Sequence, residues 1–182
     1  MKRVSVFGGS RTVPGEDDYL HAYQLGQLLG SRGLTVLTGG YTGSMEAVSR
    51  GAAEHSGHVI GVTCNQIENW RPVKPNAWVH EEVRFETLRE RLDAMIESCQ
   101  AALALPGGPG TLTEIALMWN LTLTQALPPR PLILIGSGWR ETFSSFRETQ
   151  SRYIPNDQWA LLSFSDNVSD AVRMLNIETP SR

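Results

Sequence analysis

Short apolar runs that end at glycine-rich turns alternate along this chain with segments of helical period. Residues 101–105 form one such run, which stops at Pro106-Gly107-Gly108-Pro109-Gly110 before a helix-forming segment begins. Strands and amphipathic helices that alternate in this way build a parallel sheet with helices on both faces. The pattern therefore predicts one doubly wound α/β domain over residues 1–177, followed by a frayed tail at 178–182.

The same pattern places the individual elements. Strands are expected at residues 4–7, 34–38, 58–63, 101–105, 131–135 and 159–164. Helices are expected at residues 16–32, 44–54, 81–100, 111–125, 139–152 and 167–175. Between them, residues 64–80 hold two prolines and two tryptophans without periodicity, which predicts a loop or flap over a pocket.

Composition narrows the class of protein. At 182 residues with a net charge of −3, the chain has no basic excess for binding nucleic acid. Cys64 and Cys99 are isolated, so a disulfide framework is not expected. The apolar run at residues 4–7 is too short for a signal or membrane segment, which predicts a cytoplasmic protein without membrane contact.

Lysine is scarce, and this excludes two chemistries. Lys2 and Lys74 are the only lysines among 16 basic residues. A Walker loop needs a lysine after its glycines, and pyridoxal phosphate needs one for a Schiff base. Neither lysine follows a plausible cofactor loop.

Three glycine-rich turns follow predicted strands and open helices. The carboxyl ends of parallel strands share one edge of a sheet, where helix N-termini favour anions. Any one turn could be a simple tight connection, but three together favour phosphate or ribose binding. The candidate substrate-binding residues are Gly8, Ser10, Gly40, Gly43, Gly107, Gly108, Gly110 and Thr111. The dinucleotide pattern G-x-G-x-x-G is absent, so a mononucleotide fits better than NAD, and an oxidoreductase is disfavoured.

Two charged side chains and one pair of histidines are candidates for catalysis or metal binding. Glu114 lies one turn inside the helix after the third glycine loop, where it can act on a bound anion; a first-turn carboxylate is also a common structural choice. Arg91 lies on the flank of its helix, a position typical of a solvated arginine. His55 and His58 straddle a helix end, so no metal site is expected there.

The predicted helix at 111–125 continues into a stretch, residues 115–129, that contains no charge. A helix apolar nearly all round must be covered on both sides. The sheet covers one side, and the other predicts a homodimer interface.

The residues 106–114 match P-G-G-x-G-T-x-x-E, and the chain thereby resembles the Lonely Guy (LOG) family over about its first 135 residues. Characterised members of that family are cytokinin riboside 5′-monophosphate phosphoribohydrolases, and the family was formerly mislabelled as lysine decarboxylase. The resemblance implies a Rossmann-like dimer and an arginine, from the pattern M-H-x-R-K, that works with the motif glutamate. That arginine falls on Arg91. Leu88, Arg89 and Leu92 replace the family's Met, His and Lys, which puts the substrate in question.

The resulting prediction is hydrolysis of the N-glycosidic bond of a nucleoside 5′-monophosphate, either a cytokinin precursor or AMP. Arg91 and Glu114 are the predicted catalytic residues, and no metal or redox cofactor is required. The alternative is a non-catalytic Rossmann-type carrier of a nucleotide or of a molybdenum cofactor.

Overall fold

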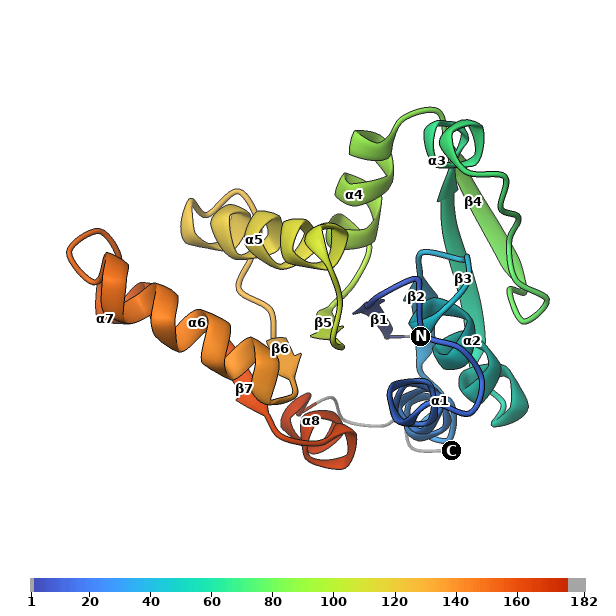
Figure 1. The fold of residues 1–182 in the computed structure, drawn as a ribbon, viewed down its shortest axis with the longest axis horizontal. Helices are drawn as coiled ribbons and strands as arrows, with labels where there is room; N and C mark the ends of the chain where they lie inside the picture. The colour runs from blue at the N-terminus through green and yellow to red at the C-terminus, as the bar shows by residue number, and fades with distance from the viewer. Residues whose placement is uncertain (1, 177–182) are drawn as a thin grey trace.

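The protein is built on one seven-stranded sheet in which every pair of neighbouring strands is parallel (Figure 1). The computed structural model describes residues 2–176, so the predicted tail lies outside the described residues. The strands are β1 (Arg3–Phe7), β2 (Thr35–Thr38), β3 (His58–Cys64), β4 (Glu81–Phe85), β5 (Ala101–Ala104), β6 (Leu132–Ile135) and β7 (Ser163–Ser165). The helices are α1 (Asp17–Gly30), α2 (Ser44–Glu54), α3 (Asn65–Trp70), α4 (Leu88–Glu97), α5 (Pro109–Leu123), α6 (Ser137–Gln150), α7 (Asn156–Trp159) and α8 (Val168–Met174).

Strand order determines where a ligand can bind. The order across the sheet is β4-β3-β2-β1-β5-β6-β7, so the chain winds outward in one direction from β1 and in the other from β5. The loops after these two adjacent strands diverge to opposite sides, which opens a crevice at the carboxyl edge of the sheet. The predicted doubly wound α/β fold is confirmed.

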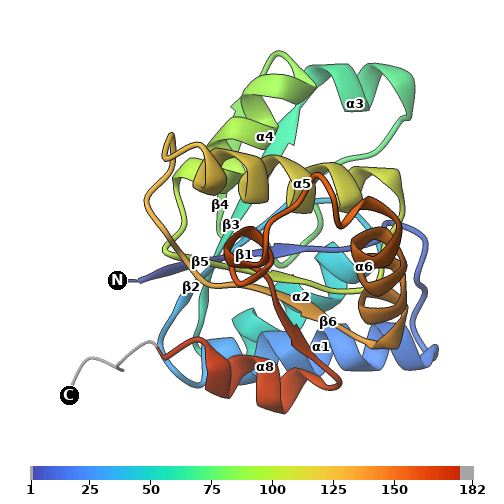
Figure 2. The same ribbon diagram turned by 90° about the vertical axis from the view of Figure 1, so that its left-hand side faces the viewer.

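Helices cover both faces of the sheet and bury two separate apolar cores (Figure 2). Helices α1, α2 and α8 pack on one face, in a core that includes Leu25, Val36 and Val172. Helices α4, α5 and α6 pack on the other, in a core that includes Ile96, Met118 and Leu134. None of the helices in residues 2–176 combines the length and apolar character needed to cross a membrane.

The segment before α4 differs from the prediction. A helix was expected from residue 81, but Glu81–Phe85 is a strand that pairs with β3, and residues 65–70 of the predicted loop form α3. β4 is an edge strand with an exposed charged face, so its Glu-Glu-Val-Arg-Phe sequence has no apolar run. The sequence does carry a signal for the true start of α4, because Thr87 and Glu90 form a capping box.

The last strand is also shorter than predicted. A strand was expected at residues 159–164, but Trp159 closes the short helix α7 and only Ser163–Ser165 pairs with β6. Trp159 is buried in an aromatic cluster with Trp119 and Phe146, and this packing determines its position. An aromatic residue alone therefore gave a misleading strand signal.

Helices α1 and α2 approach each other closely because each has a glycine packed against the backbone of the other. A Cβ at Gly51 would lie under 3.0 Å from the Tyr23 carbonyl oxygen of α1. A Cβ at Gly26 would lie equally close to the Val48 carbonyl oxygen of α2. These positions leave no room for a side chain, so the helix pair depends on both glycines.

We expect Gly51→Ala to lower the free energy of unfolding by about 2–3 kcal/mol, because the added methyl group meets backbone that cannot move aside cheaply. Gly138→Ala in α6 is the matched control, since a Cβ there has no neighbour within 4 Å. Alanine favours helix, so the control should be neutral or slightly stabilising. Urea unfolding measures both, and equal stability of the two variants would contradict the close-packing argument.

Candidate active site

The three glycine-rich turns meet at one edge of the sheet, as predicted. Backbone hydrogen bonds join them: the Gly9 N–H donates to the Pro106 carbonyl at 3.1 Å, and the Ser44 N–H donates to the Gly9 carbonyl at 2.9 Å. The Thr42 hydroxyl donates to the Ser10 carbonyl at 3.2 Å. The turn after β1 is therefore held between the other two.

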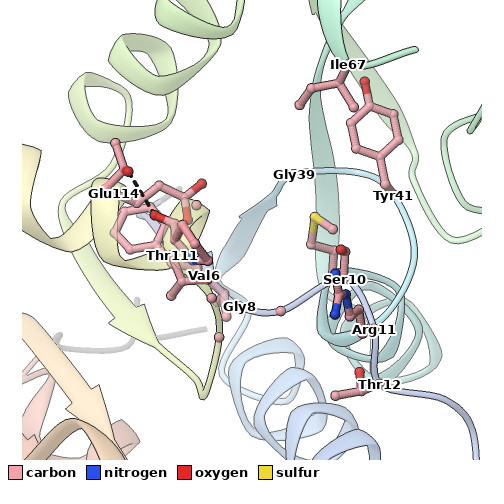
Figure 3. Close-up of a pocket in the computed structure, with 18 of the residues that line it drawn as sticks. Val6, Gly8, Ser10, Arg11, Thr12, Gly39, Tyr41, Ile67, Thr111 and Glu114 are labelled. Atoms are coloured by element: carbon pink, nitrogen blue, oxygen red, sulfur yellow. Dashed lines mark hydrogen bonds between the residues drawn. The ribbon is translucent and has the colours of Figure 1, made fainter. Parts of the chain in front are cut away.

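A cavity of about 720 Å³ opens above this junction. Figure 3 shows its walls, with Thr111 and Glu114 on one side and Tyr41 and Ile67 on another. Of the predicted binding residues, six line it: Gly8, Ser10, Gly107, Gly108, Gly110 and Thr111. The predicted catalytic residues Arg91 and Glu114 line it as well. The cavity size suits a ligand of nucleotide dimensions.

Gly40 and Gly43 lie in the second turn but are not among the lining residues, which there are Gly39 and Tyr41. Both have positive φ, 76° in each case. The Gly40 carbonyl accepts the Asn76 N–H and side-chain amide, and a Cβ at Gly43 would collide with Ser10. The structure gives these two glycines contacts that shape the turn, and their predicted contact with substrate stays a prediction.

The third turn presents a helix N-terminus to the cavity. Gly108 is the N-cap of α5, Pro109 is its first residue, and Thr111 is 3% exposed. A Cβ at Gly107 would lie under 3.0 Å from the Thr111 hydroxyl oxygen, so glycine is needed there. The first N–H groups of a helix have no partner within it, and the dipole favours an anion at this end. Gly110 and Thr111 are thus placed to hold an anionic group.

Arg91 and Glu114 face each other across the floor of the cavity. The Arg91 Nη1 lies 3.7 Å from Glu114 Oε1, and each residue is 6% exposed. The Arg91 Nε donates to the Val62 carbonyl at 2.8 Å, which anchors the guanidinium to β3. Because its side chain points inward, Arg91 is not the solvated arginine that its position on the helix flank suggested.

The second turn makes room for this arginine. A Cβ at Gly39 would lie under 3.0 Å from Arg91 Nη2 and from the Met45 sulfur. A side chain at this position after β2 would therefore displace the Arg91 guanidinium and the Met45 sulfur from where they lie. The sequence Gly39-Gly40 does not indicate which side chain packs against it, and only the tertiary structure shows that this side chain is Arg91.

Burial changes the ionisation of the carboxylate. Desolvation raises the pKa of Glu114 to about 7, although the positive charge of Arg91 acts to lower it. The side chain therefore exchanges a proton near neutral pH, which suits a group that acts as a general base or acid.

Sequence reasoning missed the residues that the flap contributes. Ile67, Trp70 and Arg71 line the cavity from α3 and its C-terminal end. Leu88 and Leu92 of α4, two of the positions that differ from the LOG pattern, line it as well. One part of the cavity is consequently apolar, whereas the glycine turns supply the polar part. The aromatic and basic residues of the flap were the one feature of the sequence that could have indicated its contribution to the cavity.

The two histidines do not converge on a site. The His55 ring contacts the Gly51 carbonyl and the Gln27 amide, whereas His58 lies 3.3 Å from Glu81 at the far edge of the sheet. Within residues 2–176, no group of three His, Cys, Asp or Glu side chains could hold a metal ion.

The fold and cavity define an α/β protein with a crevice lined by glycine-rich turns and a buried arginine–glutamate pair beside it. The chain belongs to the SLOG cluster4 family, whose model matches residues 1–152. The resemblance to the LOG family is thereby confirmed.

Two relatives illustrate the similarity. A pyrimidine/purine nucleotide 5′-monophosphate nucleosidase of Escherichia coli strain K12 is 33% identical over 141 residues, or 72% of this chain and 30% of that protein. A probable cytokinin riboside 5′-monophosphate phosphoribohydrolase of Oryza sativa subsp. japonica is 39% identical over 120 residues, or 63% and 46%. The chain thus spans less than half the length of these curated relatives.

Solved structures share the fold over nearly the whole chain. A molybdenum cofactor binding protein from Rippkaea orientalis is 25% identical, with a TM-score of 0.72 over 95% of this chain and 94% of that one. The molybdenum cofactor carrier protein of Chlamydomonas reinhardtii is 22% identical, with a TM-score of 0.71 over the same shares. The second likeness concerns the fold alone.

The raised pKa of Glu114 predicts how stability depends on pH. Below pH 4.5 the carboxyl is protonated in both the folded and unfolded states. Between pH 4.5 and 7 the folded state binds more protons, so the free energy of unfolding falls as pH rises. Relative to Glu114→Gln, we expect wild type to lose on the order of 2–3 kcal/mol between pH 5 and 8.

Urea unfolding of both proteins across this range measures the difference. Glu141→Gln, at an exposed position on α6, is the control for removing a carboxylate that is not buried. If the difference in free energy of unfolding between wild type and Glu114→Gln stays constant with pH, the raised pKa of Glu114 is contradicted.

Proposed function

We propose that this protein hydrolyses the N-glycosidic bond of a nucleoside 5′-monophosphate to free base and ribose 5-phosphate. The observation that carries the proposal is the buried Arg91–Glu114 pair, at 3.7 Å, next to a helix N-terminus suited to a phosphate. The names of the E. coli and rice relatives support it, since both refer to cleavage of nucleoside 5′-monophosphates. AMP and cytokinin riboside monophosphates are the candidate substrates.

In this mechanism the substrate phosphate lies against the turns at Gly8–Ser10 and Gly107–Thr111. Thr111 and Glu114 are one turn apart on α5, so the ribose of a nucleotide held at Thr111 extends toward the carboxylate. As the C–N bond breaks, its electron pair leaves with the base and positive charge develops on the ribose. Water then adds to the anomeric carbon, and the base takes up a proton.

Glu114 stabilises the developing positive charge and orients the attacking water in its ionised form. Its pKa of about 7 lets it accept the proton of that water and return it near neutral pH. Arg91, fixed by its bond to the Val62 carbonyl, positions the carboxylate and contacts the ribose phosphate or the departing base. No step requires a metal or a redox cofactor.

We expect wild type to release adenine from AMP and Glu114→Gln to lose at least ~100-fold in kcat, because both charge and water orientation suffer. Chromatography of the released base, with AMP and cytokinin riboside monophosphates as substrates, measures turnover. Glu141→Gln on α6 should retain wild-type turnover. Near wild-type turnover of Glu114→Gln would eliminate the assignment.

The second candidate function is a non-catalytic carrier of a nucleotide or of a molybdenum cofactor. It is supported by the likeness to a molybdenum cofactor binding protein at 25% identity. The same assay separates the two functions, because a carrier binds AMP or the cofactor tightly without releasing a base. The hydrolase is favoured, since the relatives named as a 5′-monophosphate nucleosidase and a phosphoribohydrolase are 33% and 39% identical to this chain, against 25% for the cofactor binding protein.

We also propose that two copies of the chain associate through α5. Its outward side carries no charge, and with α6 it forms an apolar groove of about 310 Å³. The groove residues are Leu112, Ala116, Trp119, Thr142, Phe143 and Phe146. A second copy that covers this groove would bury the exposed parts of Leu112 and Phe146.

We expect Ala116→Glu to convert a dimer into a monomer, because the interface would then bury an unpaired charge. Sedimentation equilibrium measures the mass. Leu20→Glu is the matched control, since Leu20 is an exposed apolar residue of α1 on the other face of the sheet. A monomeric wild type, or a dimer that survives Ala116→Glu, would contradict the interface.

The cytoplasmic location and the absence of a nucleic-acid partner stay predictions. The buried thiols of Cys64 and Cys99, which are not joined in a disulfide, agree with a reducing compartment.

A further inference from the structure

The flap contributes an arginine whose side chain is incompletely paired. Arg71 is the C-cap residue of α3 and lines the cavity. Its backbone is fixed, because its N–H donates to the Ile67 carbonyl at 2.8 Å and its carbonyl accepts the Val73 N–H at 2.7 Å. The side chain is thus delivered to the cavity from a defined point.

The guanidinium of Arg71 lies over the first glycine turn. Its Nη1 donates to the Ser10 hydroxyl oxygen at 3.3 Å, and the Trp70 ring centroid lies 5.9 Å from its central carbon. Its Nε is buried and has no hydrogen-bond partner within residues 2–176. A buried guanidinium N–H without an acceptor is unfavourable, so an acceptor supplied by a ligand would satisfy it.

The other cavity arginines differ from Arg71. Arg91 bonds the Val62 carbonyl through Nε and lies beside Glu114 through Nη1, which leaves it fewer free donors than Arg71 has. Arg11 is exposed to solvent. Arg71 therefore combines a partly buried position with unused donor capacity, next to the turn whose Gly9 N–H binds the Pro106 carbonyl.

A full positive charge would add to the attraction that the partial charges of backbone N–H groups exert on a phosphate at the glycine turns. The planar fork of a guanidinium offers two parallel donors to phosphate oxygens. We propose that Arg71 binds the 5′-phosphate of the substrate from the flap side, opposite the N-terminus of α5. This inference rests on the proposed function, because it assigns the phosphate of that same substrate.

If Arg71 binds the phosphate, its replacement should weaken the affinity for phosphorylated ligands and leave the affinity for the nucleoside nearly unchanged. Binding is measured by calorimetry in the Glu114→Gln background, which prevents turnover, with AMP, ribose 5-phosphate and adenosine as ligands. We expect Arg71→Gln to weaken AMP and ribose 5-phosphate roughly 10- to 100-fold, the value of a charge-assisted hydrogen bond. Adenosine affinity should change less than about twofold, and Arg71→Lys should recover part of the loss.

Arg152→Gln is the matched control, because it removes the same charge from an exposed position away from the cavity. It should leave all three affinities unchanged. Equal weakening of AMP and adenosine by Arg71→Gln would mean that the arginine only supports the flap, and would overturn the proposal. So would unchanged AMP affinity.

Turnover by the chain with Glu114 intact separates this inference from the proposed function. Binding of AMP without release of adenine would overturn the hydrolase assignment, while the Arg71→Gln comparison still tests the phosphate contact. If AMP and ribose 5-phosphate do not bind at all, both proposals fail. With turnover intact, Arg71→Gln should raise KM for AMP far more than it lowers kcat.

Discussion

The site depends on keeping a carboxylate and a guanidinium together where water is largely excluded. Burial of an ionised pair is costly, and each partner must be held by other contacts for the arrangement to persist. Arg91 receives such a contact from the Val62 carbonyl of β3, and Gly39 after β2 leaves space for its side chain. Glu114 is fixed by its place on α5. Strands and helices far apart in sequence thus converge on one ion pair.

The parallel sheet explains why this convergence is available at a single edge. Because β1 and β5 are adjacent, the turns that follow them run in opposite directions, and α5 begins at the crevice between them. The backbone bonds between Gly9, Pro106 and Ser44 then hold three turns as one unit. The polar and apolar portions of the cavity come from different parts of the chain, the turns on one side and α3 with α4 on the other.

Strongly periodic segments and local motifs were predictable from the sequence, and so was the role of the third turn as the start of a helix. The edge strand β4 was not, because an exposed strand rich in glutamate lacks the apolar run that identifies buried strands. Helical spacing alone assigned Arg91 to a solvated flank, and only the family resemblance identified it as a residue of the site. Arg71 and Trp70 lay in a segment without periodicity, where only tertiary contacts reveal which side chains enter the cavity.

The flap over the cavity is fastened at several points. Tyr41 accepts the Cys64 N–H at the start of the segment, Arg84 of β4 pairs with Glu68 of α3, and the Asn76 amide bonds the Gly40 and Tyr41 carbonyls near its end. A ligand that enters the cavity therefore meets a preformed surface. Little of its interaction free energy is consumed in ordering the chain, and tight association needs no slow closing step.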